Sequence, residues 1–230
     1  MTYDVVVFDV LGTVVDEDEA RKRATATLFA SAGRSADAVD AFALAWDEAE
    51  SELIGAVAGA RAGWETHDAI CLKALRDIVR RDEAGASFSA EAMSTAALFG
   101  RDIEPWPESV RAIDALRAER PVIALTNGSA PTMAEMSRRT GLRWTELISA
   151  DDVETFKPNP RMYERLTSRG IAEPRTTLFV AAHPWDLDTA AQHCYRTALV
   201  LRPGVPAEAG YDHLVDDLDG IVALFSATAG

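Results

Sequence analysis

The sequence predicts an α/β fold in which helices cover both faces of an open parallel β-sheet. Short, uninterrupted apolar runs are typical of strands buried on both faces, and helical patterns lie between these runs. This alternation favours a parallel sheet. A third observation is a long helical stretch after the first run that interrupts the alternation. A chain of 230 residues can hold one large domain with an inserted module.

Four apolar runs are the predicted strands, and each ends in polar or turn-forming residues. They cover residues 5–8, 121–125, 177–180 and 197–201. Helical patterns follow at 109–118 and 160–168. Ligands of open parallel sheets bind outside the carboxyl ends of the strands. The polar residues that follow three of these runs, Asp9, Thr126 and His183, are therefore the first candidates for a functional site.

Residues 17–95 have apolar residues at helical spacing and lack strand signals, with Gly59 and Gly63 as the expected break between two helices. We therefore predict a core formed by residues 1–15 and 96–230, with a helical insertion at residues 16–95.

Composition excludes several classes of protein and partner. The formal net charge of −14 argues against nucleic acid and anionic membranes, because both would repel the chain at long range. The sequence contains neither a secretion signal nor the ~20-residue apolar stretch that spans a bilayer. Cys71 and Cys194 lie far apart without metal-ligand spacing, which favours a reduced, cytoplasmic chain. We expect a small-molecule substrate and leave a homodimer open.

Asp9 stands at the end of the first predicted strand, where a buried carboxylate must be solvated, hydrogen-bonded or paired. Taken alone, it has two equally good interpretations, a functional carboxylate or a cap of the following turn. Lys157 has a more specific setting, because Asn159 is a good N-cap and Pro160 a good first helical residue. A lysine just before a fixed helix start can be held beside a carboxylate.

The segment Phe8-Asp9-Val10-Leu11-Gly12-Thr13-Val14-Val15-Asp16 resembles the first motif of the haloacid dehalogenase superfamily. The resemblance implies a Rossmann-like sheet core with an inserted helical cap domain. It also implies that Asp9 is a nucleophile that forms a covalent ester with substrate, and that Thr13 supports this carboxylate.

Two further segments resemble the next motifs of that superfamily in the same order. Residues 125–128 contain Thr126 and Asn127, which by resemblance bind the anionic part of the substrate. A helix cap or turn is the alternative role for Thr126. Residues 156–163 contain Lys157, which by resemblance is the cation beside Asp9. A cation there keeps the carboxylate ionised and stabilises negative charge in the transition state.

The fourth motif distinguishes the branches of the superfamily. Magnesium-dependent phosphatases have an acidic Asp two residues after the nucleophile and a metal-binding Asp after the third predicted strand. This chain has Leu11 and Ala182 at those positions. Both differences disfavour Mg²⁺, and we expect neither a metal ion nor another cofactor.

Residues 180–186, which end in Trp185-Asp186, and the helical insertion with Trp46 resemble the type II 2-haloacid dehalogenases. The resemblance implies that Asp186 orients Lys157 or water and that Tyr163 helps to build the site. Leu11 would contribute an apolar wall. The implied reaction is metal-independent hydrolysis of a short 2-haloacid through an ester on Asp9.

This sequence departs from the type II pattern at two informative positions. His183 replaces an Asn, and we expect it to act as the base for the hydrolytic water. Hydrogen bonding to nearby carbonyl groups is the alternative. Asp47 follows Trp46, where the branch has an anion-binding Arg. Arg61 is a substitute cation, although a surface role is the simpler interpretation.

Other residues and other functions remain as alternatives. The three remaining histidines are expected to be surface or packing residues: His67, His193 and His213. A magnesium-dependent phosphohydrolase is the second enzyme hypothesis. A non-catalytic relative that binds a metabolite or a partner is the third. Retention of Asp9, Lys157 and Asp186 argues against the third, because a dead site has no physical need for this trio.

Overall fold

A six-stranded parallel sheet forms the core of the computed structural model, which describes residues 3–81 and 88–226. In spatial order the strands are β5 (Glu146–Ser149), β4 (Val122–Thr126), β1 (Val5–Phe8), β6 (Thr177–Ala181), β7 (Arg196–Val200) and β8 (His213–Val215). The central strand β1 pairs with β4 on one side and β6 on the other. Loops that are far apart in sequence therefore meet at the carboxyl edge of three adjacent strands.

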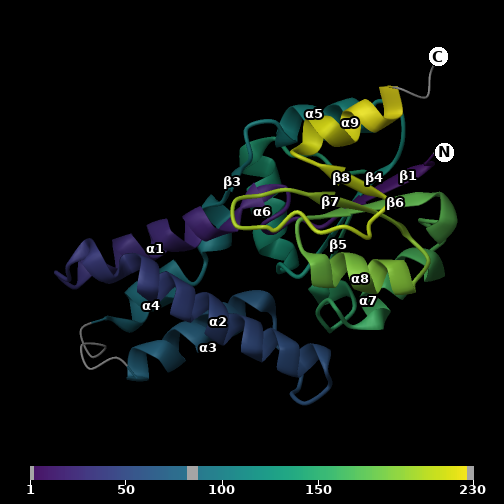
Figure 1. Ribbon diagram of the computed structural model, residues 1–230. Helices are drawn as coiled ribbons and strands as arrows, with labels where there is room; N and C mark the ends of the chain where they lie inside the picture. Colours follow the sequence, from purple (N-terminus) through teal and green to yellow (C-terminus); the bar gives the residue numbers. More distant parts are fainter. Residues whose placement is uncertain (1–2, 82–87, 227–230) are drawn as a thin grey trace.

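Helices cover both faces of this sheet, as the apolar runs predict (Figure 1). Side chains alternate along β1, so Val6 and Phe8 face one layer and Val5 and Val7 face the other. The first layer contains α5 (Ser109–Arg117), α6 (Ala130–Thr140) and α9 (Leu218–Ser226). The second contains α7 (Pro160–Ser168) and α8 (Pro184–Gln192). The α/β prediction is confirmed.

The insertion folds as a helical cap beside the sheet domain (Figure 1). Its helices are α1 (Glu17–Ser31), α2 (Val39–Ala58), α3 (His67–Arg81) and α4 (Ala90–Ala96), with short turns at η1 (Ala36–Ala38) and η3 (Phe99–Asp102). Helix α2 ends just before Gly59, as predicted. Aromatic contacts such as that between Phe29 and Phe42 pack the cap helices together, and the apolar residues of the cap are continuous with those on one face of the sheet.

A short antiparallel pair joins the cap to the core. Strand β2 (Val15–Asp16) pairs with β3 (Glu104–Pro105), so the chain leaves and re-enters the core at one place. The first predicted boundary, between residues 15 and 16, falls within β2. The second, at residue 95, falls inside α4, because α4 packs against the cap helices α1 and α3. The cap extends to about residue 103.

The four predicted strands are present with ends within one residue, whereas β5 and β8 were not predicted. Strand β5 begins with Glu146, and β8 is a three-residue strand that begins with His213. Both lie at the edges of the sheet, where a continuous apolar run is not required. Two further short turns precede α7 and β6, at η4 (Ala150–Asp152) and η5 (Pro174–Thr176).

Within residues 3–81 and 88–226, no helix combines the length and apolar character that crossing a bilayer requires.

Candidate active site

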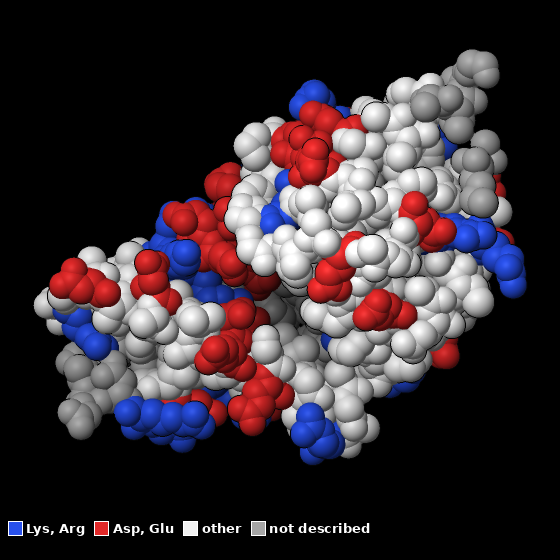
Figure 2. Space-filling view, viewed as in Figure 1, with Lys and Arg blue, Asp and Glu red and all other residues white. Residues whose placement is uncertain are grey.

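A cleft of about 640 Å³ lies between the carboxyl edge of the sheet and the cap. Its core side contains Asp9, Lys157 and His183, and its cap side contains Arg21 and Asp47. Acidic side chains border the hollow between the two lobes in Figure 2. Seven of the cleft-lining residues are carboxylic acids: Asp9, Asp16, Glu17, Asp18, Glu19, Asp47 and Glu50. An anionic substrate would therefore enter a mainly acidic environment.

Asp9 follows β1 directly and is 4% exposed. Its backbone N–H donates to the Val180 carbonyl at 3.0 Å, which holds it at the edge of β6. Lys157 Nζ lies 2.7 Å from Asp9 Oδ1. The Thr13 hydroxyl donates to Oδ2 at 2.6 Å, and His183 Nδ1 lies 2.9 Å from the same oxygen. The two carboxylate oxygens thus have different surroundings, and both are fixed in orientation.

Gly12 allows His183 to approach Asp9 closely. The backbone of Gly12 has a φ of +74°, and a Cβ atom there would lie 2.9 Å from the His183 ring. A side chain at position 12 would therefore strain the turn and displace the imidazole. The Thr13 hydroxyl also accepts a hydrogen bond from the Ala182 N–H at 2.8 Å, which ties the loop after β1 to the loop after β6.

Lys157 is 1% exposed and is held by its backbone as well as by its side chain. The Lys157 N–H donates to Asn127 Oδ1 at 2.7 Å, and Asn127 Nδ2 donates to the Lys157 carbonyl at 3.3 Å. Asn159 caps α7, as predicted, and its Nδ2 also donates to the Ala58 carbonyl of the cap at 2.7 Å. Asn127 therefore positions Lys157 from the loop after β4.

Asp186 lies in the first turn of α8 and is fully buried. Lys157 Nζ lies 2.5 Å from its Oδ2, so one ammonium group joins Asp9 and Asp186. The Tyr163 hydroxyl donates to Asp186 Oδ1. Tyr163 is itself 0% exposed, so it positions Asp186 from behind and does not form a wall that touches substrate.

The charges in this cluster keep Asp9 ionised. Burial opposes ionisation of Asp9, but Lys157 and His183 outweigh that effect, so the pKa of Asp9 is well below its usual value. Burial lowers the pKa of His183, but the hydrogen bond and the charge of Asp9 raise it above its usual value. Burial, together with repulsion from Asp9, raises the pKa of Asp186. Asp9 is therefore ionised at neutral pH.

Two predicted substrate-binding residues lie away from the cleft surface. Trp46 is 0% exposed in the cap core, where Nε1 donates to the Cys71 carbonyl at 2.9 Å and the ring packs on Phe99. The expectation that Trp46 contacts substrate is therefore wrong. Thr126 is also 0% exposed, and its hydroxyl accepts a hydrogen bond from the Gly128 N–H at 3.1 Å. Its structure agrees with the alternative role in a turn.

Asp47 faces the cleft. Its side chain is 45% exposed and lies 3.0 Å from Arg21. Arg61 instead donates to the Gly55 carbonyl at 3.3 Å in an exposed position. The buried cation on the cap side of the cleft is Arg21, which the sequence analysis did not identify. The sequence offered one signal for it: Arg21 stands four residues after Glu17 on a predicted helix, a spacing that favours an ion pair.

The Arg21 guanidinium is already surrounded by carboxylates. Glu50 lies 2.6 Å away, Asp47 3.0 Å and Glu17 3.2 Å. The opposite side of Glu50 contacts His67 Nε2 at 3.0 Å. His67 is 6% exposed and forms an ion pair with Glu50. The prediction of a surface or packing residue did not include this ion pair.

The position between the two core carboxylates is occupied by a side-chain cation. Lys157 Nζ joins Asp9 to Asp186 at hydrogen-bond distance, and the neighbouring positions carry Leu11 and Ala182, which offer no side-chain oxygen. Mg²⁺ prefers oxygen ligands in octahedral geometry. These residues do not fit a magnesium ion at Asp9.

Comparisons with known proteins find dehalogenases similar to this chain in sequence and in fold. A (S)-2-haloacid dehalogenase from Burkholderia cepacia is 25% identical over 97% of this chain and 94% of that enzyme. Haloacetate dehalogenase H-2 from a Moraxella species is 32% identical over 54% of this chain and 58% of that enzyme. The crystal structure of a defluorinating L-2-haloacid dehalogenase superimposes with a TM-score of 0.88 at 25% identity, and covers 97% of this chain and 95% of that one.

The family model that matches describes a haloacid dehalogenase-like hydrolase and covers residues 3–193. That segment contains the cap and every residue of the cluster around Asp9. The chain belongs to the haloacid dehalogenase-like hydrolase family, as its motifs predict.

Proposed function

We propose that this protein hydrolyses the carbon–halogen bond of a short 2-haloacid through an aspartyl ester on Asp9, without a metal ion at that step. The observation that carries the proposal is the single Lys157 ammonium shared by Asp9 and Asp186 on the floor of the cleft. This ammonium group keeps the buried Asp9 carboxylate ionised, and the cleft gives a substrate access to that carboxylate. The names of the relatives supply the substrate class.

The first step is displacement at the carbon that carries the halogen. Asp9 Oδ2 has contacts with Thr13 and His183, whereas Oδ1 contacts Lys157. The less encumbered Oδ1 attacks the carbon, a C–O bond forms, and halide leaves with the electron pair of the C–halogen bond. A halide is a stable anion, which explains why an acid two residues after Asp9 is not needed and Leu11 can stand there.

The second step is hydrolysis of the ester. Once Asp9 is esterified it no longer carries a negative charge, so the pKa of His183 falls and the imidazole releases its proton. Neutral His183 then accepts a proton from the water that attacks Asp9 Cγ. The Cγ–Oδ1 bond breaks, the second proton of the attacking water passes to Oδ1, and Oδ1 leaves with the product as its hydroxyl oxygen, while the water oxygen stays in the Asp9 carboxylate. One proton is released for each halide, which balances the overall reaction.

The test is a halide-release assay on purified protein with short 2-chloroacids and 2-fluoroacids. Asp9→Asn is isosteric but a poor nucleophile, so turnover should fall at least ~10³-fold. The far-UV circular dichroism spectrum should be unchanged. Wild-type activity should persist in excess chelator and should not increase with Mg²⁺. Near-normal turnover by Asp9→Asn would rule out the ester.

A magnesium-dependent phosphohydrolase is the competing function, and the same assay separates the two. Phosphate-ester hydrolysis that chelator abolishes and Mg²⁺ restores would favour it. Leu11 and Ala182, which offer no side-chain oxygen beside Asp9, argue against it. The cytoplasmic location and the homodimer stay predictions.

A further inference from the structure

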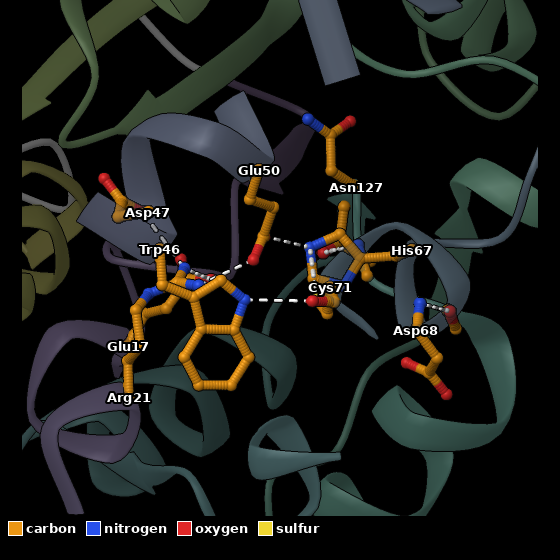
Figure 3. Close-up of polar contacts among 12 residues, drawn as sticks. Glu17, Arg21, Trp46, Asp47, Glu50, His67, Asp68, Cys71 and Asn127 are labelled. Carbon is orange, nitrogen blue, oxygen red and sulfur yellow. Dashed lines mark hydrogen bonds and ion pairs between the residues drawn. The ribbon is translucent and has the colours of Figure 1, made fainter. Parts of the chain in front are cut away.

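Three side chains with metal-binding chemistry converge in the cap, beside the cleft (Figure 3). Glu50 projects from α2, and His67 and Cys71 project from one face of α3. One carboxylate oxygen, one imidazole nitrogen and the thiol sulfur lie within 4.8 Å of one another. Their residues are 3%, 6% and 1% exposed. The proposed reaction uses none of the three.

We propose that Glu50, His67 and Cys71 bind one divalent transition-metal ion of the Zn²⁺ type. Zinc in proteins takes carboxylate, imidazole and thiolate ligands in tetrahedral geometry, with ligand atoms roughly 3.3–3.6 Å apart. Here His67 Nε2 lies 3.0 Å from Glu50 Oε1 and 4.0 Å from Cys71 Sγ. Cys71 Sγ lies nearer to His67 Nδ1, at 3.5 Å, so coordination through Nε2 requires the imidazole and the thiol to rotate toward a common point.

The backbone favours this arrangement. Positions 67 and 71 are four residues apart, so both side chains lie on the same side of one helix. Glu50 faces them from α2, and the α2–α3 pair is the most extensive helix–helix contact in the cap. The ligands thus come from two rigid, packed helices rather than from a loop, which is a good basis for a metal site.

An outer contact orients the Glu50 ligand. Arg21 donates to Glu50 Oε2 at 2.6 Å, which leaves Oε1 directed toward His67. Trp46 Nε1 donates to the backbone carbonyl of Cys71 at 2.9 Å, which ties α2 to the α3 backbone at that residue. Hydrogen bonds of this kind to the ligands are a regular feature of protein metal sites.

The local charge also favours a cation. Arg21 contacts three carboxylates, those of Glu17, Asp47 and Glu50. Burial and the neighbouring acids raise the pKa of Glu17 to about 7 despite Arg21. A divalent ion that displaces one proton from His67 and one from the Cys71 thiol leaves the net charge of the cluster unchanged, so the exchange leaves no unbalanced charge in the cap.

The fourth coordination position can be filled from the cleft. Glu50 and His67 both line the cleft, while Cys71 lies behind them. A water molecule can therefore complete the tetrahedron on the open side. This site does not depend on the proposed dehalogenation, because its ligands are separate from Asp9, Lys157 and Asp186.

The test is direct metal binding by the purified full chain. Protein stripped with chelator is titrated with Co²⁺, and then with Zn²⁺ as a competitor. We expect one equivalent of Co²⁺ with an intense near-ultraviolet thiolate-to-cobalt band, which Zn²⁺ removes. Burial raises the pKa of the Cys71 thiol to about 12, and metal binding must displace that proton. Affinity should therefore increase with pH.

The two cysteines provide a matched pair of variants. Cys71→Ser should remove the thiolate band and weaken Zn²⁺ binding at least tenfold. Cys194→Ser should leave both unchanged, because Cys194 is exposed and lies after α8. His67→Gln, with folding checked by circular dichroism, should also lose binding. Absence of stoichiometric binding in the wild type, or a band that survives in Cys71→Ser, would overturn the proposal and leave the cluster as a buried network of ion pairs.

Discussion

Two buried clusters of charge face each other across the cleft, and each places one cation among several carboxylates. In the core cluster, Lys157 joins Asp9 and Asp186. In the cap cluster, Arg21 contacts Glu17, Asp47 and Glu50 (Figure 3). The core cluster stands on loops that follow strands, and the cap cluster stands on the faces of helices.

The two clusters differ in how their charges balance. In the core, His183 adds a second cation beside Asp9, and the pKa of Asp9 is held low. In the cap, three carboxylates face two cations, Arg21 and His67, and the pKa of Glu17 rises to about 7. In the core cluster the positive charges equal the negative charges, which keeps Asp9 ionised. In the cap cluster the carboxylates are in excess, which favours proton binding or the binding of a further cation.

The largest effect is expected from removal of the core cation. Lys157→Met leaves two buried carboxylates without their shared ammonium, which should lower the free energy of unfolding by about 3–5 kcal/mol. It should also abolish halide release. Arg21→Met should cost less stability, because Glu17 already binds a proton near neutral pH. Urea unfolding of the two variants in parallel makes the comparison. Equal losses would contradict the difference in charge balance.

The next effect concerns His183. His183→Gln keeps a hydrogen-bond donor near Asp9 but cannot accept a proton from water. We expect turnover to fall by about 10²-fold or more, with a rapid first release of halide before the slow steady state. Stopped-flow halide detection measures this burst. A uniform slowing without a burst would mean that His183 acts before ester hydrolysis.

A smaller, opposite effect is expected at Asp47. This carboxylate faces the cleft beside Arg21, and repulsion of a substrate carboxylate costs on the order of 1 kcal/mol. Asp47→Arg removes that repulsion and adds a guanidinium group that can form a bidentate hydrogen-bonded pair with the substrate carboxylate. The KM for short 2-haloacids should fall several-fold, with a smaller change in kcat. Asp47→Asn, which removes only the charge, is the control and should have an intermediate KM.

The smallest effect is a change in pH-dependent stability. The pKa of Glu17 is raised on folding from 4.5 to about 7, so the folded protein holds a proton that the unfolded chain has lost. Stability from this group is therefore lost as pH rises from about 4.5 to 7. Glu17→Gln should flatten the Tm profile in this window by several degrees, measured in excess chelator. Identical profiles for the two proteins would contradict the surplus of acid in the cap.

The core cluster was largely predictable from sequence, because strand ends and helix caps have local signals. Asp9 follows an apolar run, and Asn159-Pro160 marks the helix that holds Lys157. Asp186 came from the resemblance alone. The structure added the contacts between distant loops, which local sequence patterns do not encode. Asn127 holds the Lys157 backbone, and Tyr163 supports Asp186 from behind.

The cap cluster was not predictable in the same way. Arg21, Glu50 and His67 are separated along the chain and come from three helices. An isolated His or Arg on a helix has no pattern that distinguishes a buried ion pair from a solvated face. For Trp46 the sequence led to the reverse mistake. It was expected to bind substrate, but it packs in the interior of the cap. Both outcomes depend on how helices pack together, which local sequence patterns describe poorly.

The central claim is that Asp9 forms an ester with the substrate. A single turnover in water labelled with oxygen-18, with enzyme in excess over a short 2-chloroacid, tests it most directly. The ester mechanism predicts an unlabelled hydroxy acid, because its new hydroxyl oxygen comes from Asp9. It also predicts one heavy oxygen in the protein, which peptide mass spectrometry would locate at Asp9. A labelled product and an unlabelled protein after that first turnover would mean that water attacks the substrate directly.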